Sequence, residues 1–169
     1  MISKILELIL RKMYLSYNPE KTISRKGIII RNYIYPLSMA GLRILDPYKL
    51  NIERKIEKPV GKPVMYMSTH SFKEDIVNAF LTVNGKGYVL FGPIRQFLRT
   101  FDGIKLLISG TVIVDRDDIK SRQASKKKMA RVFSLGANMI VFPEGTWCIS
   151  PNKLTENMHI GSYDILVSA

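Results

Sequence analysis

From Pro63 onward, short apolar runs alternate with longer segments whose apolar residues recur at helical spacing. The apolar runs predict buried strands at residues 64–68, 86–91, 111–115 and 138–142. The longer segments predict helices at residues 75–83, 94–100 and 119–135. Gly136 follows the last of these segments, where a glycine commonly ends a helix. Strands that alternate with helices predict an α/β domain with a mixed, mainly parallel sheet flanked by helices.

The first 60 residues have a different pattern. Residues 1–15 place Lys4, Glu7 and Arg11 on one polar stripe, which predicts an amphipathic helix that packs on its own domain or lies in the headgroup region of a membrane. A second apolar segment covers residues 28–45 and contains Pro36. A membrane span needs about 20 apolar residues, so we expect a kinked helix or a helical hairpin that enters one leaflet.

These patterns divide the chain into two regions. Residues 1–60 form a basic, apolar docking region, and the charged, proline-bearing residues 46–62 form a linker into the main domain. Residues 61–169 form the main domain. Residues 161–169 look like the opening of another helix with no strand after it, so we expect the chain to be truncated.

Composition narrows the class of protein. The 169 residues fit about one domain, and 46% hydrophobic and 24% charged residues exclude a wholly disordered chain and a polytopic membrane protein. The single cysteine, Cys148, excludes an internal disulfide and a multi-cysteine zinc site. The net charge of +12 favours an anionic partner. Because the first 60 residues hold 12 basic and 5 acidic side chains among many apolar ones, a membrane surface is favoured over nucleic acid.

Two polar residues follow the strand predicted at 64–68. His70 lies at its carboxyl end, where α/β folds usually place ligands, and Asp75 comes five positions later. A carboxylate bound to one ring nitrogen fixes the tautomer and leaves the other nitrogen as a base. Because a His with an Asp five positions away is common, the spacing on its own favours the plainer interpretation, in which Asp75 is a first-turn helix residue and His70 a capping residue.

Two further motifs follow strand ends. Arg116 closes the segment GTVIVDR, and it fits either a phosphate ligand or a solvated surface residue. Residues 142–146 read FPEGT, which fits either a simple turn or a binding loop. In a binding loop, Gly145 lets the backbone approach a ligand, and Glu144 can accept hydrogen bonds from a substrate hydroxyl or from backbone.

Taken together, THSFKED, GTVIVDR and FPEGT resemble, in order and spacing, the motifs of the glycerolipid acyltransferase family, which includes the 1-acyl-sn-glycerol-3-phosphate acyltransferases. The resemblance covers about residues 60–169. It implies that His70 is the general base and that Asp75 orients it. It also implies an acceptor site that includes the following residues: Arg116, Glu144, Gly145 and Thr146.

The resemblance implies a reaction and its partners. A fatty acyl group would pass from acyl-CoA or acyl carrier protein to a lysophospholipid hydroxyl, with no cofactor, no metal and no covalent acyl-enzyme. The implied location is the cytoplasmic face of the cell membrane, where the protein would be peripheral or monotopic on an anionic surface. The family's fourth motif, a strand with a proline, is absent here, which again suggests a truncated chain.

One departure affects the acceptor. Family members that use lysophosphatidic acid often have Arg directly after EGT, whereas this chain has Trp147. Lysophosphatidic acid is therefore ranked first only narrowly, with another lysophospholipid head group as the alternative. A truncated, non-catalytic membrane-binding module is the competing interpretation. Nucleic acid is not expected, because aromatic residues are not interleaved with basic ones.

Three other features have plain interpretations. Residues 126–128 are three lysines that we expect on a solvated helix face, with contact to donor phosphates as the alternative. Cys148 is expected to be a small buried or half-buried side chain, and His159 an exposed one.

Overall fold

The structure of the chain is a computed structural model. It describes four longer stretches, residues 15–45, 60–72, 75–83 and 110–146, and the shorter stretch 87–92. It also describes isolated positions near the two ends: residues 8, 12, 148–149, 152–153, 155–159, 161 and 164.

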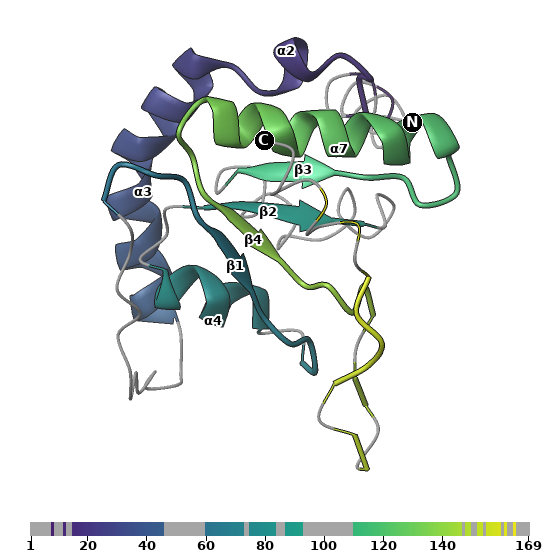
Figure 1. Ribbon diagram of the computed structural model, residues 1–169. Helices are drawn as coiled ribbons and strands as arrows, with labels where there is room; N and C mark the ends of the chain where they lie inside the picture. The colour runs from purple at the N-terminus through teal and green to yellow at the C-terminus, as the bar shows by residue number, and fades with distance from the viewer. Residues whose placement is uncertain are drawn as a thin grey trace.

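A four-stranded sheet forms the centre of the molecule (Figure 1). Its strands are β1 (Met65–Met67), β2 (Tyr88–Phe91), β3 (Thr111–Ile113) and β4 (Met139–Val141). The spatial order is β1-β4-β2-β3, and each neighbouring pair is parallel. The register pairs Met65 with Met139, Tyr88 with Met139, and Val89 with Thr111. Parallel pairing brings the carboxyl ends of all four strands to one edge of the sheet.

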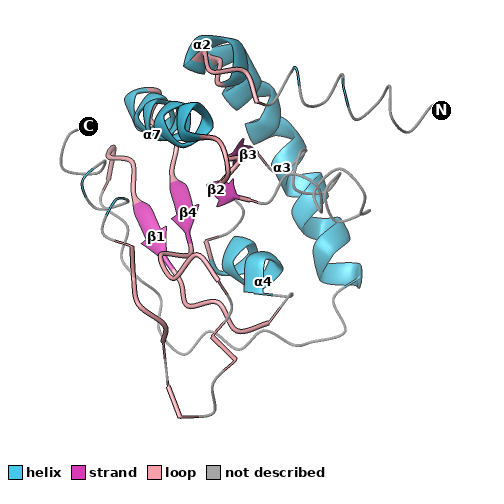
Figure 2. Ribbon diagram, turned by 90° about the vertical axis from the view of Figure 1, so that its right-hand side faces the viewer, coloured by secondary structure: helices cyan, strands magenta, loops and turns pink. Residues whose placement is uncertain are grey.

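Helices cover both faces of the sheet (Figure 2). The described helices are α2 (Pro19–Thr22), α3 (Arg25–Leu45), α4 (Asp75–Thr82) and α7 (Ile119–Ser134). The core on the α7 side includes Val112, Val132 and Val141, and the core on the α4 side includes Phe80 and Ile140. Alternate strand residues thus supply the two cores, which explains the continuous apolar runs of these doubly buried strands.

The long helix α7 is bounded by two local signals. At its start, the Asp118 side chain accepts a hydrogen bond from the backbone N–H of Lys120 at 2.9 Å, which caps an otherwise unpaired amide. After its end, Gly136 has a φ of 76°, the left-handed conformation that glycine adopts readily. The predicted helix at 119–135 is therefore confirmed to within one residue.

The α/β class and its parallel sheet were predicted correctly. Each of the four predicted strands is present in a shorter form, and the helix predicted at 75–83 corresponds to α4. Every strand pair among the described residues is parallel, so this part of the chain does not contain the antiparallel strand that a mixed sheet would have. The helix predicted at 94–100 lies outside the described residues. So does most of the helix predicted at 161–169, of which Gly161 and Asp164 are described.

The apolar segment at 28–45 is part of one helix. Helix α3 continues through Pro36, so the helical-hairpin alternative is wrong. One side of α3 is held on the sheet, where the Tyr35 hydroxyl donates to the Gly87 carbonyl at 3.1 Å. On the same side the buried Arg31 guanidinium lies 3.8 Å from the centroid of the Tyr88 ring. These contacts hold the buried side of α3 on the sheet. Pro36 lies on the exposed side, so it does not interrupt them.

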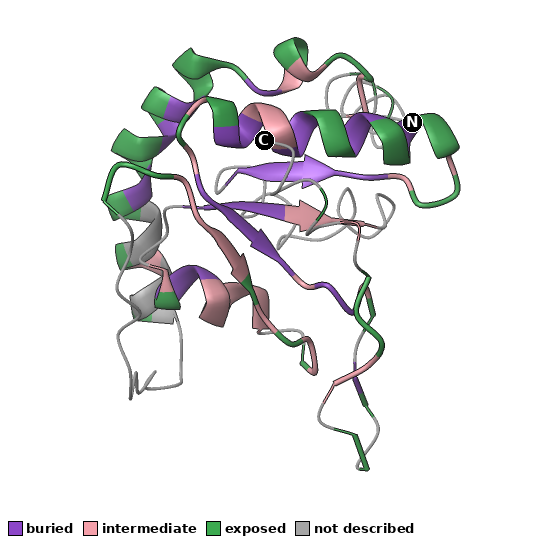
Figure 3. Cartoon of the chain, in the orientation of Figure 1, coloured by how far each residue is buried: buried purple, intermediate pink, exposed green. Residues whose placement is uncertain are grey.

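The other side of α3 is exposed (Figure 3). It presents large apolar side chains at Ile30, Tyr33 and Leu37, which are 59%, 79% and 76% exposed. No helix among the described residues is both long and apolar enough to cross a membrane. The amphipathic helix predicted at 1–15 is described mainly at Leu8 and Lys12, and the linker at 46–62 lies mostly outside the described residues.

The lysine run on α7 was predicted only in part. Lys126 and Lys127 are exposed as expected, but the expected exposure of Lys128 is wrong, since its side chain is 2% exposed. The helical phase explains the difference, because Lys128 lies one turn from the buried Ala124 and one turn from the buried Val132. Burial lowers the pKa of Lys128 to about 8.

Candidate active site

The three motifs meet at the carboxyl edge of the sheet. His70 follows β1, Arg116 follows β3, and residues 142–146 follow β4. Since β4 is the neighbour of β1, and β2 separates β4 from β3, the FPEGT turn lies between the other two motifs.

His70 and Asp75 are in contact. The Nδ1 atom of His70 lies 3.3 Å from Oδ2 of Asp75. A carboxylate can only accept a hydrogen bond, so this contact assigns the ring proton to Nδ1 and leaves Nε2 as an acceptor. The side chains are 14% and 19% exposed, so the pair is sheltered yet reachable from solvent.

The loop between these residues folds around the same carboxylate. Oδ2 of Asp75 also accepts the backbone N–H groups of Ser71 at 2.5 Å and Phe72 at 2.7 Å. Asp75 is the first residue of α4, where a carboxylate is stabilised by the unpaired amides of a helix start. The H-x4-D spacing therefore makes a closed loop that holds the carboxylate against His70.

The FPEGT segment holds His70 from the other side. The His70 ring packs on the Phe142 ring, with centroids 4.7 Å apart. The backbone N–H of His70 donates to Oε1 of Glu144 at 3.0 Å, and its carbonyl accepts the N–H of Cys148 at 2.6 Å. The second oxygen of Glu144 accepts the N–H of Glu156 at 2.8 Å, and the Glu144 side chain is 2% exposed.

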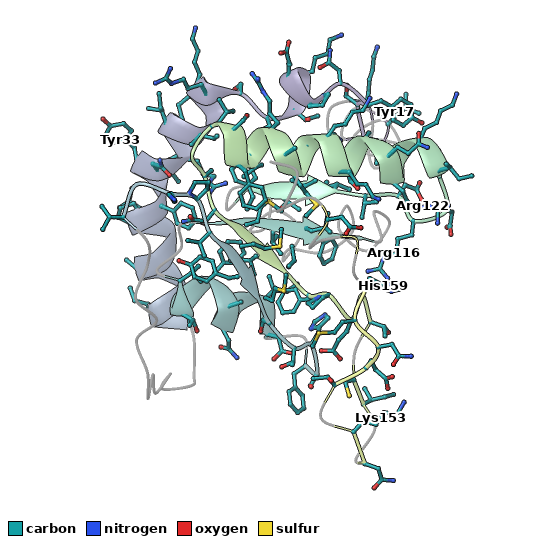
Figure 4. All side chains as sticks on the ribbon, viewed as in Figure 1. Tyr17, Tyr33, Arg116, Arg122, Lys153 and His159 are labelled. Atoms are coloured by element: carbon teal, nitrogen blue, oxygen red, sulfur yellow. The ribbon has the colours of Figure 1, made fainter. Side chains whose placement is uncertain are left out.

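Arg116 reaches the same turn from the far side of β2. Its Nη1 donates to the Gly145 carbonyl at 2.6 Å, and the side chain is otherwise exposed (Figure 4). It passes over Gly92, the residue after β2, where a Cβ atom would lie 3.3 Å from Nε of Arg116 and 2.8 Å from the Val114 carbonyl oxygen. The absence of a side chain at Gly92 thus opens the path between β3 and the turn.

His159 lies on the outer side of this turn. Its backbone N–H donates to the Pro143 carbonyl at 2.8 Å. Its imidazole is exposed and lies 3.2 Å from the position that a Cβ atom at Gly145 would occupy. Gly145 has a φ of 66°, so both its backbone conformation and its neighbour favour glycine.

The structure joins the predicted site residues through one turn. His70 and Asp75 contact each other and His70 contacts Glu144, whereas Arg116 contacts Gly145. Thr146 is exposed beside them, and Trp147 lies outside the described residues. Cys148 is buried and His159 exposed, as predicted. Among the described positions, no group of three or more His, Cys, Asp or Glu side chains could hold a metal ion.

Sequence reasoning missed Gly92 and the placement of His159. A glycine directly after a predicted strand is a signal for close approach by another group, so Gly92 could have been found. The placement of His159 depends on two hydrogen bonds, one between Glu144 and Glu156, 12 positions apart, and one between Pro143 and His159, 16 positions apart. No local sequence pattern predicts such contacts.

Comparison with known proteins agrees with these motifs. A model of the acyltransferase family matches residues 49–169. The chain is 30% identical over 108 residues to the chloroplastic 1-acyl-sn-glycerol-3-phosphate acyltransferase of Arabidopsis thaliana. That match covers 63% of this chain and 30% of the plant protein, so the chain spans less than a third of its relative. No solved structure matches the chain. The family match and the three motifs confirm the resemblance, and the chain belongs to the glycerolipid acyltransferase family.

Proposed function

We propose that the protein transfers a fatty acyl group from acyl-CoA or acyl carrier protein to the hydroxyl of a lysophospholipid. The observation that carries the proposal is the contact between Nδ1 of His70 and Oδ2 of Asp75 at the carboxyl edge of a parallel sheet. In such sheets ligands bind outside the carboxyl ends of the strands. The acceptor proposed first is 1-acyl-sn-glycerol-3-phosphate, and the product is then phosphatidic acid.

The proposed reaction has His70 as its general base. Nε2 takes the proton of the acceptor hydroxyl while the hydroxyl oxygen attacks the thioester carbonyl carbon. The new C–O bond forms, the C–S bond breaks, and the thiolate takes the proton back from Nε2. Asp75 holds the tautomer and stabilises the positive imidazolium while it exists. The step needs no cofactor besides the donor and leaves no acyl group on the protein.

The proposed acceptor site is the outer side of the FPEGT turn. An Arg side chain has five N–H donors, and the bond of Arg116 to Gly145 uses one of them. The remaining donors of this exposed side chain can face an anionic head group in planar, bidentate geometry. The imidazole of His159 and the hydroxyl of Thr146 lie at the same exposed turn. A phosphomonoester is proposed first, and a larger lysophospholipid head group second, because Trp147 stands where a second Arg is common.

The proposed location is the cytoplasmic face of an anionic membrane, with the protein peripheral or monotopic. The supporting observation is the exposed apolar side of α3, next to the exposed basic residues Arg25 and Lys26 at its start. Apolar burial combined with about 1 kcal/mol for each basic residue near an anionic surface favours such docking. Binding should therefore be stronger on vesicles that contain phosphatidylglycerol than on phosphatidylcholine alone, and no shift of nucleic acid is expected.

The test of the function is acyl transfer by the full chain. With palmitoyl-CoA and lysophosphatidic acid as substrates, free thiol and phosphatidic acid should appear at the same rate. A thiol-reactive dye measures the thiol, and mass spectrometry measures the phosphatidic acid. His70→Ala should lower the rate about 100-fold or more, with vesicle flotation and circular dichroism unchanged. A His70→Ala variant within tenfold of the wild type would remove His70 from the base role. A wild-type chain that floats but releases no thiol would favour the non-catalytic membrane-binding module.

A further inference from the structure

The side chain of Glu144 points into the protein, between two backbone segments. It is 2% exposed, and each of its carboxylate oxygens accepts one backbone N–H group, from His70 at 3.0 Å and from Glu156 at 2.8 Å. We infer that Glu144 is a positioning residue for the base His70, and that it does not contact the acceptor. The inference rests on the proposed role of His70 and deepens it.

The chemistry of the carboxylate supports this role. A buried charge is costly unless hydrogen bonds or an opposite charge satisfy it. Among the described residues no ion pair includes Glu144, so the two backbone N–H groups stabilise its charge. Amide-to-carboxylate bonds are among the stronger hydrogen bonds in proteins. A substrate hydroxyl that took one oxygen would have to compete with a backbone amide already in place.

The contact with His70 fixes where its ring lies. The N–H of His70 is held by Glu144, its carbonyl by Cys148, and its ring by Phe142, so three residues of one segment define its position. Asp75 then sets the rotation of the ring. A misplacement of about 1 Å can cost about 100-fold in rate, so loosening the backbone of His70 should reduce turnover more than acceptor binding.

The second oxygen extends the same control to the acceptor side. This oxygen accepts the N–H of Glu156 and so fixes the segment that contains residues 156 and 159. In the same segment, the backbone N–H of His159 donates to the Pro143 carbonyl. That segment places the His159 ring against Gly145, next to the carbonyl that binds Arg116. One buried carboxylate therefore sets the base and the outer side of the turn relative to each other.

The kinetic test is Glu144→Gln in the full chain. The Gln side chain keeps one accepting oxygen and opposes the second amide with its own NH2 group. We expect kcat to fall about 100-fold while the KM for lysophosphatidic acid changes less than about threefold. The matched control is Glu20→Gln, the same change at a 73% exposed side chain on α2, and it should leave both parameters unchanged. A raised acceptor KM with unchanged kcat would overturn the inference and make Glu144 a substrate ligand.

A spectroscopic test does not depend on turnover. The chain has two histidines, so 15N-histidine labelling gives two backbone amide signals, and His159→Asn assigns them. The His70 amide proton should lie downfield, exchange slowly with solvent, and remain protected when lysophosphatidic acid is added. In Glu144→Gln it should move upfield by several tenths of a ppm, whereas Glu20→Gln should not move it.

The outcomes separate this inference from the proposed function. If the wild type shows no acyl transfer, the proposed function fails, but the His70 amide still reports the contact. If the variant Glu144→Gln does not fold, the wild-type amide remains decisive. Fast exchange of that amide, or loss of its protection when the acceptor binds, would overturn the positioning role.

Discussion

Gly92 offers the sharpest test of how Arg116 reaches the turn. In Gly92→Ala the new Cβ atom would lie 2.8 Å from the Val114 carbonyl oxygen and 3.3 Å from Nε of Arg116. The Val114 backbone cannot retreat freely, because its N–H donates to the Phe91 carbonyl at 2.9 Å and closes the β2–β3 ladder. The Arg116 side chain is exposed and can move, so it should leave the Gly145 carbonyl.

The size of the effect follows from these contacts. Overpacking against the Val114 backbone should cost about 1–3 kcal/mol of stability, which lowers Tm by about 2–12 °C for a chain of this size. Loss of a charge-assisted contact to the acceptor is worth about 1.5–3 kcal/mol, so kcat/KM for lysophosphatidic acid should fall about 10- to 150-fold. The KM for palmitoyl-CoA should change little.

The assay compares matched glycines and a double variant. Gly41→Ala on α3 adds the same methyl group where nothing lies within 4 Å, and it should leave acceptor use unchanged. If Gly92 acts through Arg116, the double variant Gly92→Ala/Arg116→Ala should be no slower than Arg116→Ala alone. Additive losses in the double variant, or normal acceptor use by Gly92→Ala, would refute the reasoning.

Five further variants test the remaining parts of the site and fold. Asp75→Asn should lower kcat about 100- to 10,000-fold without loss of vesicle binding, because the amide cannot stabilise the imidazolium as a carboxylate does; a loss below tenfold in the thiol-release assay would contradict this. Arg116→Ala should reduce kcat/KM for lysophosphatidic acid about 10- to 150-fold, and Trp147→Arg should improve use of lysophosphatidic acid relative to lysophosphatidylcholine; an unchanged acceptor ratio in a competition assay would show that position 147 does not contact the head group. Replacing Ile30, Tyr33 and Leu37 together by Ser should release the chain from phosphatidylglycerol vesicles in a flotation assay. The control is a folded Ile28→Ser variant, which changes the buried side of α3 and should still float with the same vesicles. Lys128→Met should raise the free energy of unfolding by about 2–3 kcal/mol at pH 7, because burial lowers the pKa of Lys128 from 10.5 to about 8 and the folded state disfavours its charge. The difference in free energy of unfolding between this variant and the wild type should shrink as the pH rises from 8 to 10.5, because the unfolded chain binds more protons than the folded one in this range. A difference that stays constant in urea titrations across this range would contradict the prediction.

Most of the fold followed from short-range signals. The apolar runs predicted the strands because a parallel strand is buried on both faces. Helix α7 begins and ends at local signals, the Asp118 cap and Gly136. Helix α3 was harder, because Pro36 suggested a break. Contacts of Arg31 and Tyr35 with the sheet hold this helix together, and tertiary contacts of that kind are not visible in local propensity.

The candidate site was predictable as a set of residues and less so as a geometry. The spacing of His70 and Asp75 alone permitted their contact without requiring it, and the resemblance of the three motifs together led us to expect it. The structure shows the contact, because the start of α4 brings the carboxylate back towards the ring. For Glu144 the residues alone allowed either a substrate hydroxyl or backbone as the partner, and the family resemblance placed it in the acceptor site. The choice depends on where residues 70 and 156 lie, and neither is near Glu144 in the chain. Lys128 shows the opposite case, since its helical phase already placed it on the buried side of α7.

The strand order explains why the FPEGT turn connects the base to the acceptor side. In the order β1-β4-β2-β3, the loop after β4 is the one that borders the loop after β1 and can also be reached from β3 across a single strand. That single strand is followed by Gly92, which leaves room for the Arg116 side chain. Successive residues of the turn then face opposite ways, with the Glu144 carboxylate directed to the His70 backbone and the Gly145 carbonyl directed to Arg116. A displacement of the turn must therefore move the base and the head-group contacts together. Variants on the two sides of the turn should consequently be coupled in double-variant cycles, although β4 and β2 lie between the strands that precede His70 and Arg116.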